Sequence, residues 1–307
     1  MRVAAMAAGA VGGYFGARMA AAGHDVHFIA RGALLEAIRT DGLRIESTLG
    51  NLHLKDAKAT SDPKAVGPVD VVLFAVKLWD TEKAAEMARP MVGPSTRVIT
   101  FQNGVDSVER IAPILGADRT AGCSAYIASV MKEPGVVSHT SGFARMVCGR
   151  IDGQPDARLD AFADAAKQSG IEIAVSPAMD VERWQKFVFL VGVSGVTAAM
   201  RMPLGPIRDD PDTRAFFHQI MREAVAVGRA QGVALAADFA DRQMTFALDA
   251  APATMKASLA HDLERGNRLE VDWLAGKVSA LGRELGVPTP ANDAVYAVLK
   301  LHRMGRR

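Results

Sequence analysis

One lysine stands near the start of a segment that is otherwise apolar or small, Trp184–Met200 (WQKFVFLVGVSGVTAAM). On a helix, Lys186 would share one face with Leu190 and Ser194. A lysine ammonium group can stabilise negative charge that develops on a carbonyl oxygen and can donate a proton to it. The same side chain can also extend from the helix start into water and pair with Glu182. The segment taken alone favours this second, structural interpretation.

A glycine-rich turn near the N-terminus indicates dinucleotide binding. The turn Ala7–Gly12 (AAGAVG) carries the second and third glycines of a G-x-G-x-x-G fingerprint, Gly9 and Gly12, but has Ala7 in place of the first. Alanine can serve there only with a negative φ. The turn follows an expected strand and opens an expected helix, which favours a cofactor site over a mere packing turn. The predicted cofactor contacts here are Ala7, Gly9, Ala10, Val11 and Gly12.

The end of the second expected strand indicates which dinucleotide binds. NAD-preferring sites have an acidic residue there, which holds the ribose hydroxyl groups. This strand instead ends in Ala30, Arg31 and Gly32, and an arginine can pair with a 2′-phosphate. The sequence therefore predicts NADP(H), with Arg31 as a cofactor contact. The alternative is that Arg31 is an ordinary surface cation.

The elements that would position these residues form two expected domains. Residues 1–177 alternate short apolar runs with helical patterns, which is typical of a Rossmann-type α/β domain with a parallel sheet. Residues 178–307 show only helical patterns and predict an all-α domain. The expected strands are 2–7, 25–30, 69–76, 97–101, 120–130 and 136–149. The expected helices are 10–23, 81–91, 156–169, 181–200, 211–231, 234–249, 269–286 and 291–303.

Composition narrows the class of protein further. The chain has 307 residues, 49% of them hydrophobic, and a formal net charge of +2, which fits a globular protein and argues against nucleic-acid binding. Two cysteines and scattered histidines without metal-type spacing predict no metal site and a reduced, cytoplasmic protein. The N-terminus does not favour export, and the longest apolar run is short of the about 20 residues of a membrane span. The apolar helix faces fit a homodimer as well as a monomer.

Six segments in order resemble the ketopantoate reductase family, of the 6-phosphogluconate dehydrogenase-like superfamily. They are AGAVGGYFGARMAAAGHDVHFIARG, LFAVKLWDT, TFQNGVDS, EPGVVSHT, WQKF and SLAHDLERGNRLEVDWLAG. The resemblance runs nearly end to end. It implies an enzyme that reduces 2-ketopantoate to pantoate with NADPH, in the pathway to coenzyme A.

The resemblance also implies roles for single residues. Lys186 matches the family's catalytic lysine, Glu270 its acidic residue at the substrate, and Ser258 the serine that holds the substrate carboxylate. Asn103 and Lys77 match polar residues that line the cofactor and substrate cleft. Structural alternatives stay open: a simple turn at Asn103, a surface ion pair for Glu270 and a strand-end cap for Lys77.

The chain departs from the family at two positions on the lysine-bearing helix face. Leu190 and Ser194 stand where the family commonly has asparagines that grip the substrate. A lost hydrogen bond to a buried substrate hydroxyl costs about 1–3 kcal/mol. The more apolar face fits a 2-oxo acid with a less polar tail, or ketopantoate in a rearranged pocket. A third possibility, from another functional class, is a non-catalytic NADP(H)-binding sensor.

Overall fold

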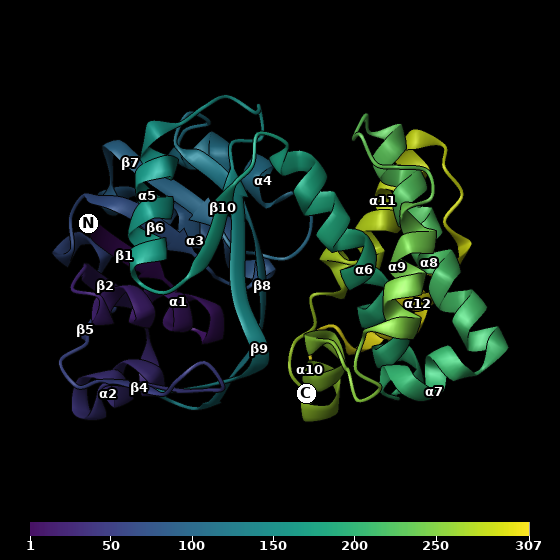
Figure 1. The fold of residues 1–307 in the computed structure, drawn as a ribbon, viewed down its shortest axis with the longest axis horizontal. Coiled ribbons are helices and arrows are strands. Elements are labelled where there is room, and N and C mark those ends of the chain that lie inside the picture. The colour runs from purple at the N-terminus through teal and green to yellow at the C-terminus, as the bar shows by residue number, and fades with distance from the viewer. Residues whose placement is uncertain (307) are drawn as a thin grey trace. The chain divides into compact units, whose positions relative to one another are not determined.

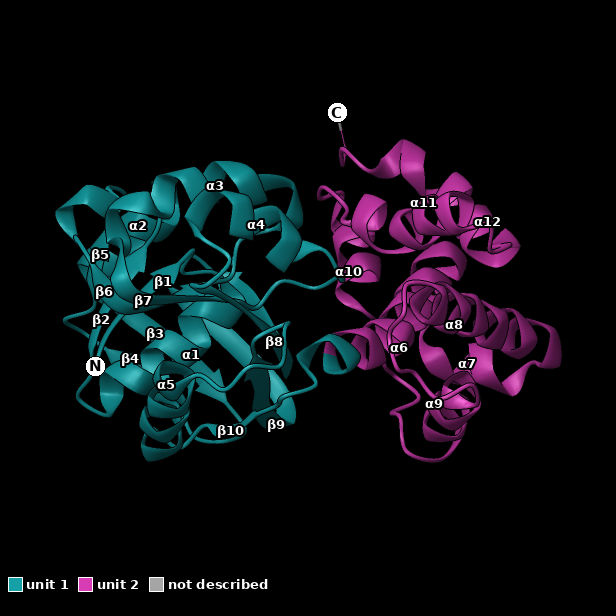
Figure 2. Ribbon diagram, turned by 90° about the horizontal axis from the view of Figure 1, so that it is seen from above, with its two compact units in different colours: residues 1–182 teal, residues 183–307 magenta. Residues whose placement is uncertain are grey.

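The chain folds into an α/β unit followed by a helical unit, which confirms the expected fold class. The computed structural model describes residues 1–306 (Figure 1). Its two compact units are Met1–Glu182 and Arg183–Arg307 (Figure 2). The division falls inside helix α6 (Met179–Met200), whereas the sequence places a domain boundary shortly before that helix. Among the described residues, no helix has the length and apolarity that crossing a membrane requires.

The first unit is built on one mixed sheet (Figure 1). The strand order is β4-β3-β9-β8-β7-β6-β1-β2-β5, and β10 pairs with β9. Strands β7, β6, β1 and β2 are parallel, and β8 and β9 form a long antiparallel pair. The strands are β1 Arg2–Met6, β2 Asp25–Ile29, β3 Leu43–Ser47, β4 Leu52–Leu54, β5 Lys58–Thr60, β6 Val69–Phe74, β7 Val92–Thr100, β8 Thr120–Glu133, β9 Val136–Gly149 and β10 Glu172–Val175.

Helices cover both faces of this sheet. One apolar cluster joins the sheet to α1, α2 and α5, and a second joins it to α3 and α4. Because both faces are covered, the central strands are continuous apolar runs, as in the β6 sequence VDVVLF. The helices of this unit are α1 Ala10–Ala21, α2 Gly32–Asp41, α3 Thr81–Ala88, α4 Ser107–Leu115 and α5 Ala157–Gln168.

The second unit packs its helices around α6. A Cβ added at Gly192 would lie 2.7 Å from side-chain atoms of Phe217 and Met221 on α8. A Cβ added at Gly195 would lie 3.2 Å from the side chain of Val295 on α12. These glycines let α6 approach its neighbours closely, so the apolar segment is a core helix, as expected. The other helices are α7 Leu204–Asp209, α8 Pro211–Ala230, α9 Phe239–Asp249, α10 Ser258–Arg265, α11 Ala275–Leu285 and α12 Pro290–Leu299.

A buried carboxylate joins two of these helices. Glu223 of α8 is 3% exposed. Its oxygens accept hydrogen bonds of 2.9 Å from the backbone N–H groups of Ala291 and Asn292, at the start of α12. The side-chain amide of Asn292 donates to the same carboxylate at 2.8 Å. Glu223 thus satisfies N–H groups that a helix start leaves unpaired.

Several expected elements differ from the structure. The single helix over 269–286 is wrong, because a 3₁₀ turn at Val271–Trp273 is followed by Leu274 with φ −106° and ψ −106°, outside the helical region. The helix expected to start at residue 234 starts at Phe239. Short elements with no expected counterpart are β3, β4, β5, β10, α2, α4, α7 and α10.

Candidate active site

The glycine-rich turn lies between β1 and α1, held by its neighbours on both sides. The backbone N–H of Ala8 donates to Ile29 O at 3.0 Å, and that of Ala75 donates to Met6 O at 2.8 Å. Gly9 caps α1 with φ −70° and ψ −166° and no side-chain hydrogen bond at the cap. A Cβ at Gly9 would meet nothing within 4 Å. The turn therefore presents bare backbone and a helix N-terminus, the arrangement that binds phosphate groups.

The other two positions of the fingerprint fit the same site. A Cβ at Gly12 would lie 2.3 Å from Ala7 O and 3.2 Å from the Ala75 Cβ, so only glycine lets α1 pack this closely on the strands. Within residues 1–306, Arg201 is the only non-glycine residue with a positive φ. Ala7 thus has the negative φ that its presence in the turn requires, and the altered fingerprint does not strain the backbone.

Arg31 follows β2 at the same edge of the sheet. It caps α2 in an extended conformation, φ −139° and ψ 158°, and its side chain is exposed. Within residues 1–306, its guanidinium group makes no hydrogen bond or ion pair. The side chain is thus available to a 2′-phosphate. The turn and Arg31 together fit a bound NADP(H), although the preference for this dinucleotide stays a prediction.

Lys77 and Asn103 follow the parallel neighbours β6 and β7. Because these strands are parallel to β1, both residues emerge at the edge where the glycine-rich turn lies. Lys77 is exposed, with its Nζ 5.6 Å from the centre of the Trp79 ring, and Asn103 is half-buried. The structure therefore brings two further predicted residues to the nucleotide edge.

Gln102 is a residue at this edge that the sequence reasoning missed. It is 8% exposed. Its side-chain amide donates to Val76 O at 3.0 Å and to Thr81 Oγ1 at 2.8 Å, and its Oε1 accepts from Thr100 Oγ1 at 3.2 Å. Gln102 thereby ties the loop after β7 to the loop after β6. Its place beside Asn103 in TFQNGVDS is the only sequence signal for this role.

The predicted residues of the second unit begin on α6. Lys186 and Leu190 lie one turn apart on the same face of α6, and both are half-buried. Ser194 is only 1% exposed, and its hydroxyl has no hydrogen-bond partner within the described chain. The next polar residue of the helix, Thr197, accepts a 3.4 Å hydrogen bond from the backbone N–H of Ala257. That contact brings the start of α10 to α6.

Ser258 and Glu270 stand on the segment that follows this contact. Ser258 is the first residue of α10 and is exposed. Glu270 is 9% exposed and caps the 3₁₀ turn Val271–Trp273, rather than lying inside a helix as expected. The structure thus places Ser258 next to the residue that contacts α6, and the roles of Ser258, Glu270 and Lys186 in the reaction stay predictions.

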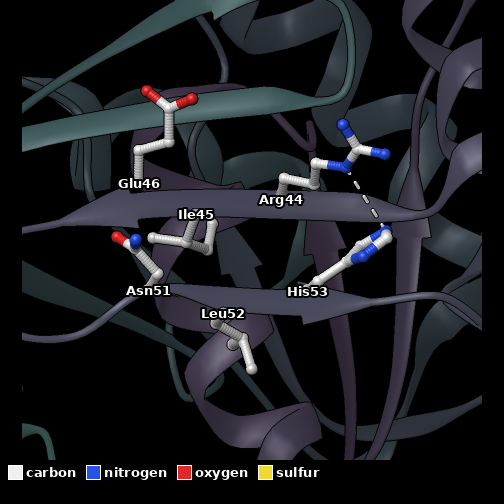
Figure 3. A pocket seen from close by; sticks show the side chains of 6 residues that line it. All are labelled: Arg44, Ile45, Glu46, Asn51, Leu52 and His53. Atoms are coloured by element: carbon white, nitrogen blue, oxygen red, sulfur yellow. Dashed lines mark hydrogen bonds between the residues drawn. The ribbon is translucent and has the colours of Figure 1, made fainter.

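A hollow on the surface of the first unit lies away from these residues. It is lined by side chains of the β3–β4 hairpin, where Arg44 and His53 approach to 3.5 Å (Figure 3). It contains none of the predicted site residues. Residues 1–306 contain no group of three or more His, Cys, Asp or Glu side chains arranged to hold a metal ion.

These features define a class of protein: a dinucleotide-dependent oxidoreductase with a Rossmann-type unit and a helical unit. Comparison with known families agrees. Residues 3–153 match "Ketopantoate reductase PanE/ApbA" and residues 178–303 match "Ketopantoate reductase PanE/ApbA C terminal". The chain belongs to the ketopantoate reductase family, and it is an oxidoreductase of the 2-dehydropantoate 2-reductase type.

Individual relatives cover nearly the whole chain. A 2-dehydropantoate 2-reductase from Mesorhizobium japonicum is 31% identical over 98% of this chain and 97% of its own length. The crystal structure of a PanE/ApbA family ketopantoate reductase from Ralstonia eutropha JMP134 is 33% identical, with a TM-score of 0.90 over 99% of this chain and 98% of that one. A 2-dehydropantoate 2-reductase from Geobacter metallireducens is 30% identical, with a TM-score of 0.91 over 98% and 99% of the two chains.

Proposed function

We propose that the chain reduces a 2-oxo acid with NADPH, and that the substrate is 2-ketopantoate, which becomes pantoate. The observation that carries this proposal is Lys186, a half-buried cation on a core helix of apolar and small residues. A charged side chain within an otherwise apolar helix is a candidate functional residue. The full-length similarity to 2-dehydropantoate 2-reductases supports a role for this lysine in the reduction. We place the reaction in the cytoplasm, because two free cysteines fit a reducing compartment.

The chemistry assigns one task to each predicted side chain. Bound NADPH supplies the hydride to the keto carbon. Lys186 donates a proton to the keto oxygen as negative charge develops there. Glu270 keeps the lysine charged and oriented. Ser258 and Asn103 donate hydrogen bonds to the substrate carboxylate or carbonyl.

Turnover by variants of the lysine tests this assignment. Loss of NADPH absorbance is followed with ketopantoate and a panel of other 2-oxo acids. The wild type should turn over ketopantoate with a kcat/KM of about 10⁴ M⁻¹s⁻¹ or more. Lys186→Ala should lose this activity and still bind NADPH, whereas Lys83→Ala, on the exposed face of α3, should keep it. Equal activity of the two variants would remove Lys186 from the mechanism.

NADPH preference depends on Arg31 in this proposal. Its exposed guanidinium group stands after β2, where no acidic side chain is present to hold ribose hydroxyls. Arg31→Ala should lower kcat/KM with NADPH and leave that with NADH nearly unchanged. Arg39→Ala is the matched control, because Arg39 is an exposed arginine of α2, the helix that Arg31 caps. An unchanged ratio of the two cofactors in Arg31→Ala would contradict the NADP assignment.

A less polar 2-oxo acid is the second candidate substrate, favoured by Leu190. This side chain offers no hydrogen bond, and Ser194 on the next turn is buried. Leu190→Asn should then raise turnover of ketopantoate and lower turnover of the apolar substrate. If Leu190→Asn gains no turnover of ketopantoate, the pocket already suits ketopantoate. NADPH binding by the wild type without turnover of any 2-oxo acid would instead favour a non-catalytic sensor.

A further inference from the structure

Two cysteines lie directly opposite each other on the antiparallel strands β8 and β9. Cys123 is the register partner of Cys148, and neither is in a disulfide. Opposed residues of neighbouring strands project from the same face of a sheet. Both side chains belong to the apolar cluster that also contains residues of α1 and α5. The two thiols therefore point into one region of the core.

The backbone hydrogen bonds of Cys148 show whether Cys123 and Cys148 form a hydrogen-bonded or a non-hydrogen-bonded pair of the antiparallel ladder. The carbonyl oxygen of Cys148 accepts a 2.8 Å hydrogen bond from the N–H of Ser176. Ser176 follows Val175, which is the register partner of Cys148 on β10. In an extended strand the N–H and C=O groups of one residue point to the same side, so both groups of Cys148 are directed to β10 and away from β8. Cys123 and Cys148 thus form a non-hydrogen-bonded pair, whose Cα atoms are about 4.5 Å apart.

That separation suits a reducible disulfide. Disulfides join Cα atoms roughly 4.4–6.8 Å apart. Opposed Cβ atoms lie about 4.5–5.5 Å apart, whereas a disulfide holds them at about 3.5–4.5 Å. The two Cβ atoms must therefore tilt toward each other while the Cα atoms stay at the short end of the disulfide range, and a bond formed with such a distortion is easier to reduce. The register favours a reversible link over a permanent one.

The two thiols differ in accessibility and reactivity. Cys123 is 4% exposed and Cys148 is fully buried. Burial, together with the nearby charge of Asp160, raises the pKa of the Cys148 thiol to about 12. A thiol that stays protonated is a poor nucleophile. Cys123 is therefore the sulfur that a small oxidant reaches first.

We propose that Cys123 and Cys148 form a reversible oxidation site that reacts with a small peroxide. The Cys123 sulfur attacks one peroxide oxygen, the O–O bond breaks, and a sulfenic acid and one water form. The Cys148 sulfur then attacks the electrophilic sulfenic sulfur, which lies directly opposite on β8, and the proton of the Cys148 thiol passes to the departing sulfenic oxygen. An S–S bond forms, the S–O bond breaks, and the oxygen leaves as a second water. Two thiols and one hydrogen peroxide thus give one disulfide and two waters.

The position gives this link a structural consequence. Ser124 follows Cys123 on β8, and its hydroxyl donates a 3.3 Å hydrogen bond to Glu182 O in the first turn of α6. The local distortion of β8 that the disulfide requires therefore acts beside an anchor of that helix. The site depends only on β8 and β9 and stands independently of the substrate proposed above.

Mass measurement on the full chain tests the proposal. The reduced protein is treated with hydrogen peroxide at neutral pH, quenched in acid, unfolded and alkylated. We expect a chain lighter by two hydrogens, without alkylated cysteine, that regains both thiols after dithiothreitol. Two alkylated cysteines after treatment of the folded protein would overturn the proposal. A disulfide between two chains would overturn it as well.

Single variants test the order of the two steps. Cys148→Ser should stop at a sulfenic acid on Cys123, which dimedone traps. Cys123→Ser should leave Cys148 unmodified, because that thiol is buried and protonated. The opposite pattern would overturn the assigned roles. If a variant does not fold, the wild-type mass still decides whether the disulfide forms.

Discussion

The two glycines of the nucleotide turn should respond in opposite ways to the same added methyl group. In Gly12→Ala the new Cβ would lie 2.3 Å from the backbone oxygen of Ala7. An ordinary van der Waals contact is 3.4 Å or more, so α1 or β1 must move by about 1 Å. A backbone oxygen cannot move aside as the end of a flexible side chain can. Overpacking of this kind lowers the free energy of unfolding by about 1–3 kcal/mol. For a unit of this size we expect Tm to fall by about 2–4 °C for each kcal/mol.

Gly9→Ala should leave stability unchanged and weaken cofactor binding. Its Cβ would meet no protein atom within 4 Å, and its φ of −70° is ordinary for alanine. The free energy of unfolding should therefore stay within about 0.5 kcal/mol of the wild type. The methyl group would occupy the space where the pyrophosphate approaches the backbone. We expect the Kd for NADPH to rise about tenfold or more, which corresponds to about 1.4 kcal/mol.

The assay pairs thermal unfolding of the nucleotide-free protein with titration of NADPH. Gly142→Ala is the control, because its Cβ also meets nothing within 4 Å and it lies on β9, away from the turn. It should match the wild type in both measurements. Equal loss of stability in Gly9→Ala and Gly12→Ala, or wild-type NADPH affinity in Gly9→Ala, would refute this account of the turn.

Three further changes test single contacts and one backbone conformation within the fold. Burial raises the pKa of Asp156, but the Arg97 guanidinium group and backbone N–H bonds outweigh burial and hold that pKa below its ordinary value. The stability that this pair contributes is therefore present above the unfolded pKa and is lost as the pH falls through the folded pKa. Asp156→Ala should lower the free energy of unfolding in urea by about 3–5 kcal/mol at neutral pH. The difference in unfolding free energy between this variant and the wild type should shrink in acid. Glu223→Gln should cost about 1–3 kcal/mol, because the NH2 group of the amide would face one of the two backbone N–H groups whose hydrogen bonds the carboxylate now accepts, whereas exposed Glu284→Gln should be neutral. Arg201→Gly should raise Tm, because φ +56° strains a side chain by about 1 kcal/mol.

The sequence predicts elements well where burial leaves a strong pattern. The strands β1, β2 and β6 are largely apolar runs covered on both faces, and each is expected near its observed place, whereas of β7 only the apolar second half is expected. The strands β4 and β5 have three residues each, partly exposed, so their periodicity is too short to recognise. The helical pattern breaks at Leu274, where no glycine or proline stands that would predict the break from sequence. There the local conformation follows from the fold around it.

The residues of the candidate site also divide into those that local sequence predicts and those whose role depends on tertiary contacts. The glycine-rich turn could be predicted because its requirements are local: open space at Gly9 and a close approach at Gly12. The common edge of Lys77 and Asn103 could also be derived, because parallel strands end together. The role of Gln102 could not, since its amide acts between loops that are 26 and 21 residues away in the chain. Such a role exists only once the strands have paired.

The position of Lys186 depends on two different packing arrangements along one helix. The first turn of α6 belongs to the α/β unit, where Ser124 donates to the carbonyl of Glu182. The later turns belong to the helical unit, where Gly192 permits close contact with α8. Lys186 lies one turn after Glu182 and before that contact. A substitution that loosens either arrangement should displace Lys186, and under the role proposed for this lysine it should lower turnover before it weakens NADPH binding.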